Sequence, residues 1–327
     1  MSTDDRNIGI VVIGRNEGAR LIACLESLGE RVRQAIYVDS GSTDGSVEAA
    51  RRSGATVVEL DMATPFTAAR ARNAGFARLI EEIPDVGMVQ FVDGDCRFCE
   101  NWIAVAAAFL KANPKVAVVC GRRREQFPDA TIYNALCDRE WDTPIGEALA
   151  CGGDCLVRVD ALRAVDGYSS DLIAGEEPEM CVRLRAAGWR IYRLDADMTL
   201  HDANITRFSQ WWKRARRAGH AFTEVAHRHL ASPFGIWRRD VMRILIWGGA
   251  VPVIAVVGSV LVNPAFLLIF AAYPLQIARI ARRDGRGWES WRYAAFTVLA
   301  KFPEMQGALE YIVSRLMRRR TGLIEYK

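Results

Sequence analysis

The sequence lacks both of the glycine-rich loops that most often hold the phosphates of a nucleotide. Neither a G-x-G-x-x-G fingerprint nor a G-x-x-x-x-G-K-[ST] loop occurs in its 327 residues. These loops cradle phosphates with backbone N–H groups at a helix N-terminus. Their absence argues against the usual dinucleotide-binding proteins and P-loop NTPases, so any diphosphate must be held in another way.

The chain also has little net charge, no internal repeat and no low-complexity stretch. Its 43 basic and 39 acidic residues leave a charge of +4, and half of its residues are hydrophobic. This composition excludes a disordered polyelectrolyte and allows a large buried core. The polar N-terminus, with two aspartates before the first apolar stretch, does not predict a secretory signal. We therefore expect a cytoplasmic body with mostly reduced cysteines.

The sequence contains eight cysteines, and four of them allow a zinc-site hypothesis. Cys96 and Cys99 have C-x-x-C spacing, and Cys151 with Cys155 could complete a zinc site. The spacing of the second pair is loose. Small core residues explain these cysteines equally well.

A long segment near the C-terminus has no charge at all. Residues 244–278 contain no Asp, Glu, Lys or Arg, and as one helix at 1.5 Å per residue they would be about 52 Å long, too long for a single hydrocarbon core of about 30 Å. The pair Asn263-Pro264 favours a turn near the middle. We therefore predict a helical hairpin, which either spans a membrane or enters it as a re-entrant or interfacial element. A buried hairpin in a soluble core is the alternative.

Arginines surround this segment and give it an orientation. The first 237 residues carry a net charge of −4 and the remainder carries +8. The positive-inside rule then predicts a cytoplasmic membrane protein with both hairpin ends, and the acidic body, on the cytoplasmic side. Anionic phospholipid is the expected partner of the basic tail, and nucleic acid is not. The flanking arginines are Arg238, Arg239, Arg243, Arg279, Arg282, Arg283 and Arg286.

Apolar runs and helical patterns alternate along the body of the chain. Such alternation predicts an α/β fold with a mainly parallel sheet and helices on both faces, and ligands bind such sheets at the carboxyl ends of their strands. The predicted strands are 8–13, 35–38, 56–60, 88–92 and 116–120, and the predicted helices are 17–28, 46–52, 67–82 and 101–112.

Polar clusters follow three of these strands. They are Gly14-Arg15-Asn16-Glu17, the segment 39–45 (Asp-Ser-Gly-Ser-Thr-Asp-Gly), and Asp93-Gly94-Asp95. Carboxylates one residue apart after a buried strand can coordinate a hard divalent cation, which could neutralise a diphosphate in place of a P-loop. A D-x-D pair is a weak signal alone, but here it shares a sheet edge with two other polar loops.

These clusters give the sequence a family resemblance. Residues 8–219 resemble a family 2 glycosyltransferase with the Rossmann-like GT-A fold, through 10–17, 37–46, 71–75, 91–95 and Gly175-Glu176-Glu177-Pro178-Glu179. The resemblance implies inverting transfer of a sugar from a nucleotide-diphosphate sugar, with Mg²⁺ or Mn²⁺ as cofactor. The expected organisation is a catalytic domain over 1–220, a basic linker or interface helix over 221–243, a membrane hairpin over 244–280, and an amphipathic basic helix and tail over 281–327.

The resemblance also implies roles for individual residues. Asp39 would bind the nucleobase of the donor, and Arg72 would lie near its diphosphate. The loop with Ile13, Arg15 and Glu17 would close over base and ribose. The metal ligands would be Asp95, with Asp93 through water and His201 as a weaker third. Simpler interpretations remain for Asp39 as a turn-capping residue and for Arg72 as a surface arginine.

Glu177 stands where the family has its catalytic base, although the family residue is usually Asp. Glu176 could exchange roles with Glu177. Both could instead be the favourable acidic first turn of a helix over 178–187. A weaker match assigns contact with the acceptor or the diphosphate to Gln210, Trp211 and Arg214, in a segment that could equally be a basic interfacial helix.

The predicted function is transfer of one sugar to a hydroxyl of a lipid-linked or cell-envelope glycan acceptor. One alternative is a polyprenyl-phosphate sugar synthase, whose phosphate nucleophile needs little help from a base. Another is a membrane protein that binds a nucleotide sugar without catalysis. A nucleotidyltransferase would need a Gly- and Lys-rich first loop, which Gly14-Arg15-Asn16 does not supply.

Overall fold

The chain divides into two compact units, which are described separately. The computed structural model describes residues 7–318, and the units are Met1–Asn204 and Ile205–Lys327. The first unit thus ends earlier than the boundary at 220 expected from the sequence. The reason is that helix α8 (Phe208–Arg228) packs along α13 (Lys301–Leu316) in the second unit.

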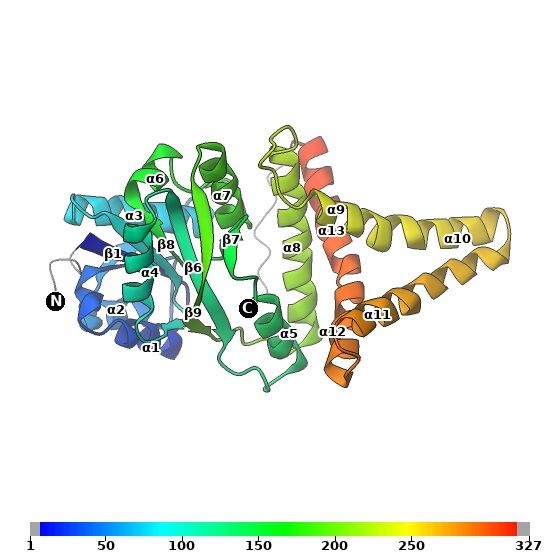
Figure 1. Ribbon diagram of the computed structural model, residues 1–327, viewed down its shortest axis with the longest axis horizontal. Helices are drawn as coiled ribbons and strands as arrows, with labels where there is room; N and C mark the ends of the chain where they lie inside the picture. Colours follow the sequence, from blue (N-terminus) through cyan, green and yellow to red (C-terminus); the bar gives the residue numbers. More distant parts are fainter. Residues whose placement is uncertain (1–6, 319–327) are drawn as a thin grey trace. The chain divides into compact units, whose positions relative to one another are not determined.

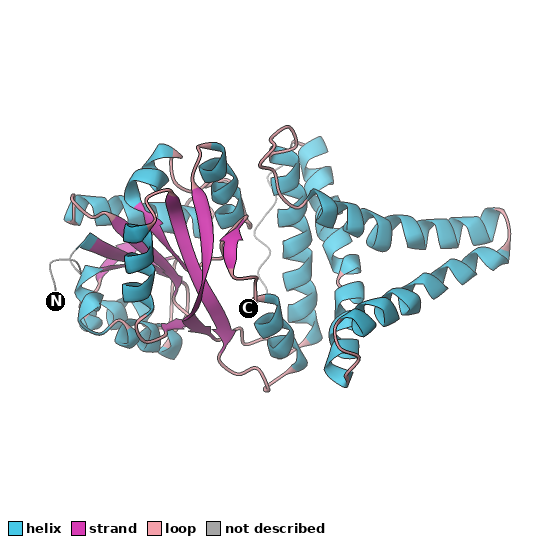
Figure 2. Ribbon diagram, viewed as in Figure 1, coloured by secondary structure: helices cyan, strands magenta, loops and turns pink. Residues whose placement is uncertain are grey.

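A sheet forms the centre of the first unit, with helices packed against it (Figure 1; Figure 2). Its strands are β1 (Ile8–Gly14), β2 (Ala35–Asp39), β3 (Thr56–Glu59), β4 (Met88–Asp93), β5 (Cys96–Phe98), β6 (Val116–Glu125), β7 (Gly146–Ala148), β8 (Cys155–Arg158) and β9 (Arg190–His201). The helices of this unit are α1 (Ala19–Ser27), η2 (Gly29–Gln34), α2 (Ser46–Ser53), α3 (Ala68–Glu82), α4 (Trp102–Ala112), α5 (Ile132–Glu140), α6 (Val159–Ala164) and α7 (Glu176–Ala186).

The strand order explains where the loops meet. Among the described residues the order is β3-β2-β1-β4-β8-β6-β9-β5, with β7 paired to β9. The strands β3, β2, β1 and β4 are parallel, as the sequence predicts. Beyond β4 the sheet is mixed, because β8 runs antiparallel between β4 and β6. The α/β prediction is therefore confirmed, and the parallel arrangement holds for the N-terminal half of the sheet.

The central strands are buried because both of their faces are covered. Every residue of β2 is buried, and only Gly14 of β1 is partly exposed. Helix α3 approaches β1 closely at Gly75, where an added Cβ would lie 2.4 Å from Val11 Cγ1. Such continuous apolar strands are typical of a parallel sheet. The close helix contact fixes the carboxyl ends of β1, β2 and β4 relative to one another.

The second unit contains only helices over its described residues. They are α8, α9 (Arg238–Ile244), the π-helical η3 (Leu245–Ala250), α10 (Val251–Leu261), η4 (Pro264–Ala271), α11 (Ala272–Arg283), α12 (Trp288–Leu299) and α13. The end of the predicted tail, residues 319–327, lies outside the described residues. Helices α8 and α13 cross at glycines, because a Cβ at Gly219 would lie 2.0 Å from the Glu304 carbonyl oxygen.

The predicted hairpin is present in this unit (Figure 1). Its first arm runs from Arg238 to Leu261 and its second from Pro264 to Arg283, and both are long and apolar enough to cross a membrane. The turn falls at Asn263, whose side chain accepts a hydrogen bond from the Ala265 N–H at 2.8 Å. The Asn-Pro pair therefore divides the charge-free run as predicted.

Candidate active site

The polar loops after β1, β2 and β4 meet at one edge of the sheet. Strand register places Gly14 beside Asp39, and Ile13 beside Asp93. The Gly94 N–H donates to the Ile13 carbonyl at 2.8 Å, and the Ser40 N–H donates to the Gly14 carbonyl at 3.0 Å. The sequence-predicted loops therefore form one continuous surface.

Asp39 is buried at the end of β2 and organises the loop that follows. Its Oδ2 accepts hydrogen bonds from the N–H groups of Gly41 and Ser42, at 2.9 and 2.8 Å. Its Oδ1 accepts from the Tyr37 hydroxyl at 2.9 Å. Burial and the nearby Asp39 carboxylate raise the pKa of Tyr37, so the tyrosine remains a donor. Asp39 thus performs the turn-capping role that the sequence left open, and the proposed base contact must use its remaining acceptor capacity.

The first loop is fastened to the second by side-chain bonds. Asn16 has a positive φ of 56°; its N–H donates to Ser42 Oγ at 2.8 Å, and its Oδ1 accepts from the Thr43 N–H at 2.7 Å. Arg15 lies over the Phe66 ring, 5.0 Å from its centroid. Glu17 pairs with Arg20 at 2.6 Å. The predicted donor residues of this loop are therefore held in place by the protein itself.

Arg72 is the centre of the site and is only 2% exposed. Its Nη2 lies 2.8 Å from Asp93 Oδ1, and its Nη1 lies 2.8 Å from both Glu176 Oε1 and Glu177 Oε1. Burial alone would lower the pKa of Arg72, but the carboxylates of Glu177, Asp93 and Glu176 outweigh it and raise the pKa. Arg72 is therefore a buried permanent cation, and the surface-arginine interpretation is wrong.

Glu176 and Glu177 begin helix α7, after Gly175 in a left-handed conformation with φ of 82°. The helix N-terminus favours these carboxylates, so the structural explanation considered for them is also satisfied. Burial raises the pKa of Glu177 to about 7, and Glu176 and Asp93 add to this increase while Arg72 opposes it. A buried carboxyl with such a pKa can accept and release a proton near neutrality.

Asp95 and His201 meet although 106 positions separate them in the sequence. The short strand β5 pairs antiparallel with the end of β9, which sets Cys96 opposite His201. His201 Nε2 lies 3.2 Å from Asp95 Oδ2, and both side chains are buried. Burial, with help from Arg123, lowers the pKa of His201 to about 4, so its imidazole is neutral at pH 7.

Together with Cys96, these two residues form a candidate metal-ligand cluster. Asp95, Cys96 and His201 offer ligand atoms within 4.8 Å of one another, and no other group of three His, Cys, Asp or Glu in the described chain does so. The cysteine zinc hypothesis fails there, because Cys151 lies 3.6 Å from Cys181 and joins neither Cys96 nor Cys99 in a metal-ligand cluster.

Two charged residues of the site escaped the sequence reasoning. Arg123 Nη2 lies 2.8 Å from Asp154 Oδ1 and 3.5 Å from Asp93 Oδ2. Asp154 is fully buried, and it also accepts a hydrogen bond from Thr199 Oγ1 at 2.7 Å. Three consecutive arginines after an apolar strand were a usable signal for Arg123. Asp154 was signalled only by the two glycines that precede it.

The predicted acceptor residues belong to α8 in the second unit. Gln210 Oε1 accepts from the N–H groups of Thr206 and Arg207, both at 3.0 Å, which caps the helix. Trp211 is buried and packs edge-to-face against Phe296, with ring centroids 5.0 Å apart. Arg214 lies on the same helix and is partly exposed. The observed contacts of Gln210 and Trp211 are structural, and an acceptor role for these residues stays a prediction.

The mixed sheet, its flanking helices and the carboxylates at its strand ends are those of the GT-A fold. Residues 9–161 match the model of the family Glycosyl transferase family 2. These residues therefore belong to that family, as the resemblance implied.

Two known proteins extend the comparison. The chain is 25% identical over 222 residues to the succinoglycan biosynthesis protein ExoA of Rhizobium meliloti, a match that covers 62% of this chain. It spans 66% of ExoA, just under two thirds of that protein's length. The mannosyltransferase PcManGT of Pyrobaculum calidifontis, solved in complex with GDP-Man and Mn²⁺, has a similar fold with a TM-score of 0.60. It is 17% identical, and the match covers 94% of this chain and 87% of that one.

Proposed function

We propose that the chain transfers a sugar from a nucleotide-diphosphate sugar to an acceptor hydroxyl, with inversion at the anomeric carbon. The observation that carries this proposal is the Arg72 cluster. One buried guanidinium pairs with Asp93 of the D-x-D segment and with Glu177 at the start of α7. A candidate base and a candidate diphosphate site are thereby held on the two sides of a single side chain.

The donor would occupy the surface formed by the loops after β1 and β2. The nucleobase would contact Asp39, with Ile13, Arg15 and Glu17 around base and ribose. Arg72 is already paired with three carboxylates, so a diphosphate would have to share it with them. GDP-Man bound by the Pyrobaculum mannosyltransferase supports a nucleotide-sugar donor of this kind.

The side chains of Asp95 and His201 fit a divalent cation. Asp95 and His201 converge, and His201 Nδ1 is buried without a hydrogen-bond partner. We propose that Asp95 and His201 hold the ion, with Asp93 assisting through water, and that Mn²⁺ is preferred because Mg²⁺ favours an all-oxygen shell. When bound, the cation would neutralise the diphosphate. Mn²⁺ in the Pyrobaculum complex supports this choice.

Glu177 would act as the base in a single displacement. Its carboxylate accepts the proton of the acceptor hydroxyl as that oxygen forms a bond to the anomeric carbon. The bond from this carbon to the diphosphate breaks on the opposite face, and the diphosphate leaves with the electron pair. A pKa of about 7 suits this transfer. Glu176 would help to hold Arg72, and Arg123 would hold Asp93.

The acceptor would be a lipid-linked or cell-envelope glycan, met at the cytoplasmic membrane. The role of ExoA in succinoglycan biosynthesis supports a glycan acceptor. The hairpin tip supports membrane attachment, because Val260, Leu261 and Leu268 are 75%, 76% and 75% exposed. Exposed apolar clusters of this kind mark membrane or protein contacts. The arginines at both ends of the hairpin would meet anionic phospholipid, with the catalytic unit in the cytoplasm.

A direct assay tests the proposal. Purified full-length chain is screened against nucleotide sugars with Mn²⁺ by thermal shift, because a ligand that binds the folded state raises the melting temperature. Radiolabelled forms of the donors that bind are then incubated with the protein and membranes. Labelled glycan or glycolipid formed by the wild type and lost in Asp95→Asn supports the proposal. Donor binding without any product in the presence of Mn²⁺ would instead indicate a nucleotide-sugar-binding protein without catalysis.

A further inference from the structure

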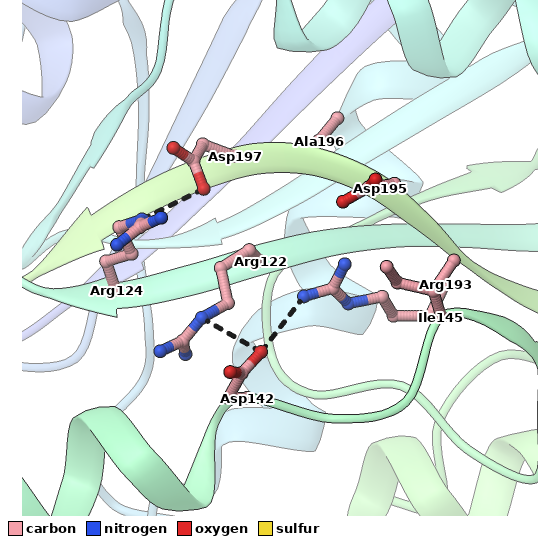
Figure 3. A pocket seen from close by; sticks show the side chains of 8 residues that line it. All are labelled: Arg122, Arg124, Asp142, Ile145, Arg193, Asp195, Ala196 and Asp197. Atoms are coloured by element: carbon pink, nitrogen blue, oxygen red, sulfur yellow. Dashed lines mark hydrogen bonds and ion pairs between the residues drawn. The ribbon is translucent and has the colours of Figure 1, made fainter.

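A polar pocket lies beside β6 and β9, apart from the Arg72 cluster. It has a volume of about 400 Å³ and is lined by arginine and aspartate side chains (Figure 3). Arg123 reaches the proposed active site, whereas its neighbours Arg122 and Arg124 reach this pocket. The pocket therefore has its own set of charges.

The buried charges of the pocket are positive. Arg122 is 8% exposed and Arg193 is 3% exposed, while the carboxylate of Asp142 is 64% exposed. Asp197 is already paired with Arg124 at 2.9 Å, and the third lining carboxylate, Asp195, is exposed. Because a buried charge requires a partner far more than an exposed one does, the pocket favours an anion beside Arg193, whose carboxylate contact is the 3.5 Å one to the exposed Asp142.

Of the two buried arginines, Arg122 has further partners, because it also pairs with Asp138 Oδ2 at 3.0 Å and donates to the Arg123 carbonyl at 2.6 Å. Arg193 is the one left incompletely satisfied. The two arginines share Asp142 Oδ1, which lies 3.3 Å from Arg122 Nε and 3.5 Å from Arg193 Nη2 (Figure 3). These separations are long for charge-assisted hydrogen bonds. Arg193 Nε is buried and has no hydrogen-bond partner. Arg193 Nη1 donates to the Leu194 carbonyl at 2.7 Å, so Arg193 Nε is the buried donor that remains unsatisfied beside Asp142.

We propose that this pocket binds the phosphate group of a phosphorylated ligand between Arg122 and Arg193, and that Asp142 is the counter-ion which the phosphate displaces. A phosphate offers several acceptor oxygens, so it can bond two guanidinium groups at once. The exposed side chain of Asp142 can turn into solvent at little cost. The volume leaves room for part of the group that carries the phosphate.

Phosphate binding in this pocket would change the surroundings of His201 in the proposed active site. Asp142 directly follows Trp141, whose ring lies 4.7 Å from the His201 ring, centroid to centroid. Arg123 lies 5.6 Å from the Trp141 ring centroid. A phosphate that displaces Asp142 would shift Trp141 beside the candidate metal ligand. The phosphate site itself does not depend on the proposed function, because its occupancy is measured without sugar transfer.

Isothermal titration of the full chain with inorganic phosphate and with farnesyl phosphate tests the site. EDTA is present throughout, so that no cation retains phosphate at Asp95. Arg193→Met should weaken phosphate binding by about 10-fold or more, as expected for lost bonds to a charged group. Asp142→Asn should tighten it several-fold, because the competing carboxylate is gone. Arg190→Met, an exposed arginine of the same strand paired with Glu147, should leave it unchanged.

The opposite effects of the two variants separate a binding site from a merely structural one. If Arg193→Met does not fold, the affinity of Asp142→Asn for phosphate still tests whether the pocket is a phosphate site. A wild-type Kd for both probes weaker than about 10 mM, unchanged affinity in Arg193→Met, or failure of Asp142→Asn to tighten would overturn the proposal. Farnesyl phosphate binding at least tenfold more tightly than inorganic phosphate would assign a lipid phosphate, and equal affinities would assign a free phosphate.

Discussion

Gly153 lies where two guanidinium groups approach one carboxylate. An added Cβ would stand 2.7 Å from Arg72 Nη2 and 3.0 Å from Asp93 Oδ2. Arg72 cannot yield easily, because three carboxylates hold it in the core. We predict that Gly153→Ala lowers sugar transfer by roughly 10-fold or more, in line with the sensitivity of positioned groups to small displacements.

Gly152 provides the matched control for this substitution. A Cβ at Gly152 meets nothing within 4 Å, so Gly152→Ala should retain activity. Both variants are compared by initial rates at saturating donor, with melting temperatures to exclude unfolding. Equal rates in the two variants would show that the contacts around Arg72 do not position the reacting groups.

The raised pKa of Glu177 predicts a pH dependence. Its carboxyl faces Arg72 from α3, Asp93 from β4 and Glu176 from its own helix, and its pKa is about 7 instead of 4.5. A base acts only when deprotonated, so turnover should rise with pH and level off above about 7. Because the folded state binds the proton more tightly, the same group stabilises the fold at low pH, and this contribution declines as pH rises through 7.

Turnover measured between pH 5.5 and 8.5, at saturating donor and metal, checks this prediction. The rise should have its midpoint near 7. A flat profile over this range would exclude Glu177 as the group that limits the rate. Glu147→Gln, which changes an exposed carboxylate of β7, should keep the wild-type profile.

Residue roles were predictable from sequence where the signal was local. Asp93 and Asp95 follow an apolar strand, and the structure places both at its end. Asp154 and Arg123 were missed because their pairing joins β6 to the bend before β8, 31 residues away, and no local pattern records it. The capping contacts of Asp39 and Gln210 could likewise not be predicted from the sequence, because the same side chains can bond either the backbone or a ligand.

At the scale of elements, length decided what the sequence could predict. Helix α3 and strands β1 and β4 have clear patterns, and their predicted bounds differ from the observed ones by one residue at most at each end. Strands β5 and β7 have three residues each, too few for any periodicity. Yet β5 is the strand that brings Asp95 to His201. The antiparallel β8 was also missed, since strand pairing is a non-local property.

The crossing of α8 and α13 gives a prediction at the same scale. Replacing glycine by alanine within a helix normally stabilises a protein by about 0.5–1 kcal/mol. Gly219→Ala should instead destabilise the chain by about 1–3 kcal/mol, because its Cβ would overlap the Glu304 backbone. The measurement is urea unfolding of the full chain in detergent. Gly287→Ala, where an added Cβ meets nothing within 4 Å, should show no such loss, and a stable Gly219→Ala would contradict the close crossing.

At the scale of the whole molecule, the acidic first part and the basic remainder of the chain correspond to different structural features. The acidic first part contains the carboxylates of the Arg72 cluster, and the basic remainder surrounds an uncharged hairpin. We predict that the full chain floats with anionic vesicles on a density gradient and does so less well at high salt.

Charges placed at the hairpin tip should weaken this attachment. Val260→Asp with Leu261→Asp places two carboxylates at the exposed apolar tip, where they would oppose its insertion into hydrocarbon. Val105→Asp, at an exposed apolar position of α4 in the first unit, should float like the wild type. Equal flotation of all three proteins would remove the hairpin as the membrane anchor.

The central claim is that Glu177 removes the proton of an acceptor hydroxyl during sugar transfer. The most direct test compares kcat of wild type and Glu177→Gln with Mn²⁺, a donor found by thermal shift and a hydroxyl acceptor. We predict a loss of roughly 10²–10⁴-fold in kcat, with the donor-induced rise in melting temperature retained. A Glu177→Gln enzyme within a few-fold of wild type would contradict the account and favour a phosphate nucleophile, as in a polyprenyl-phosphate sugar synthase.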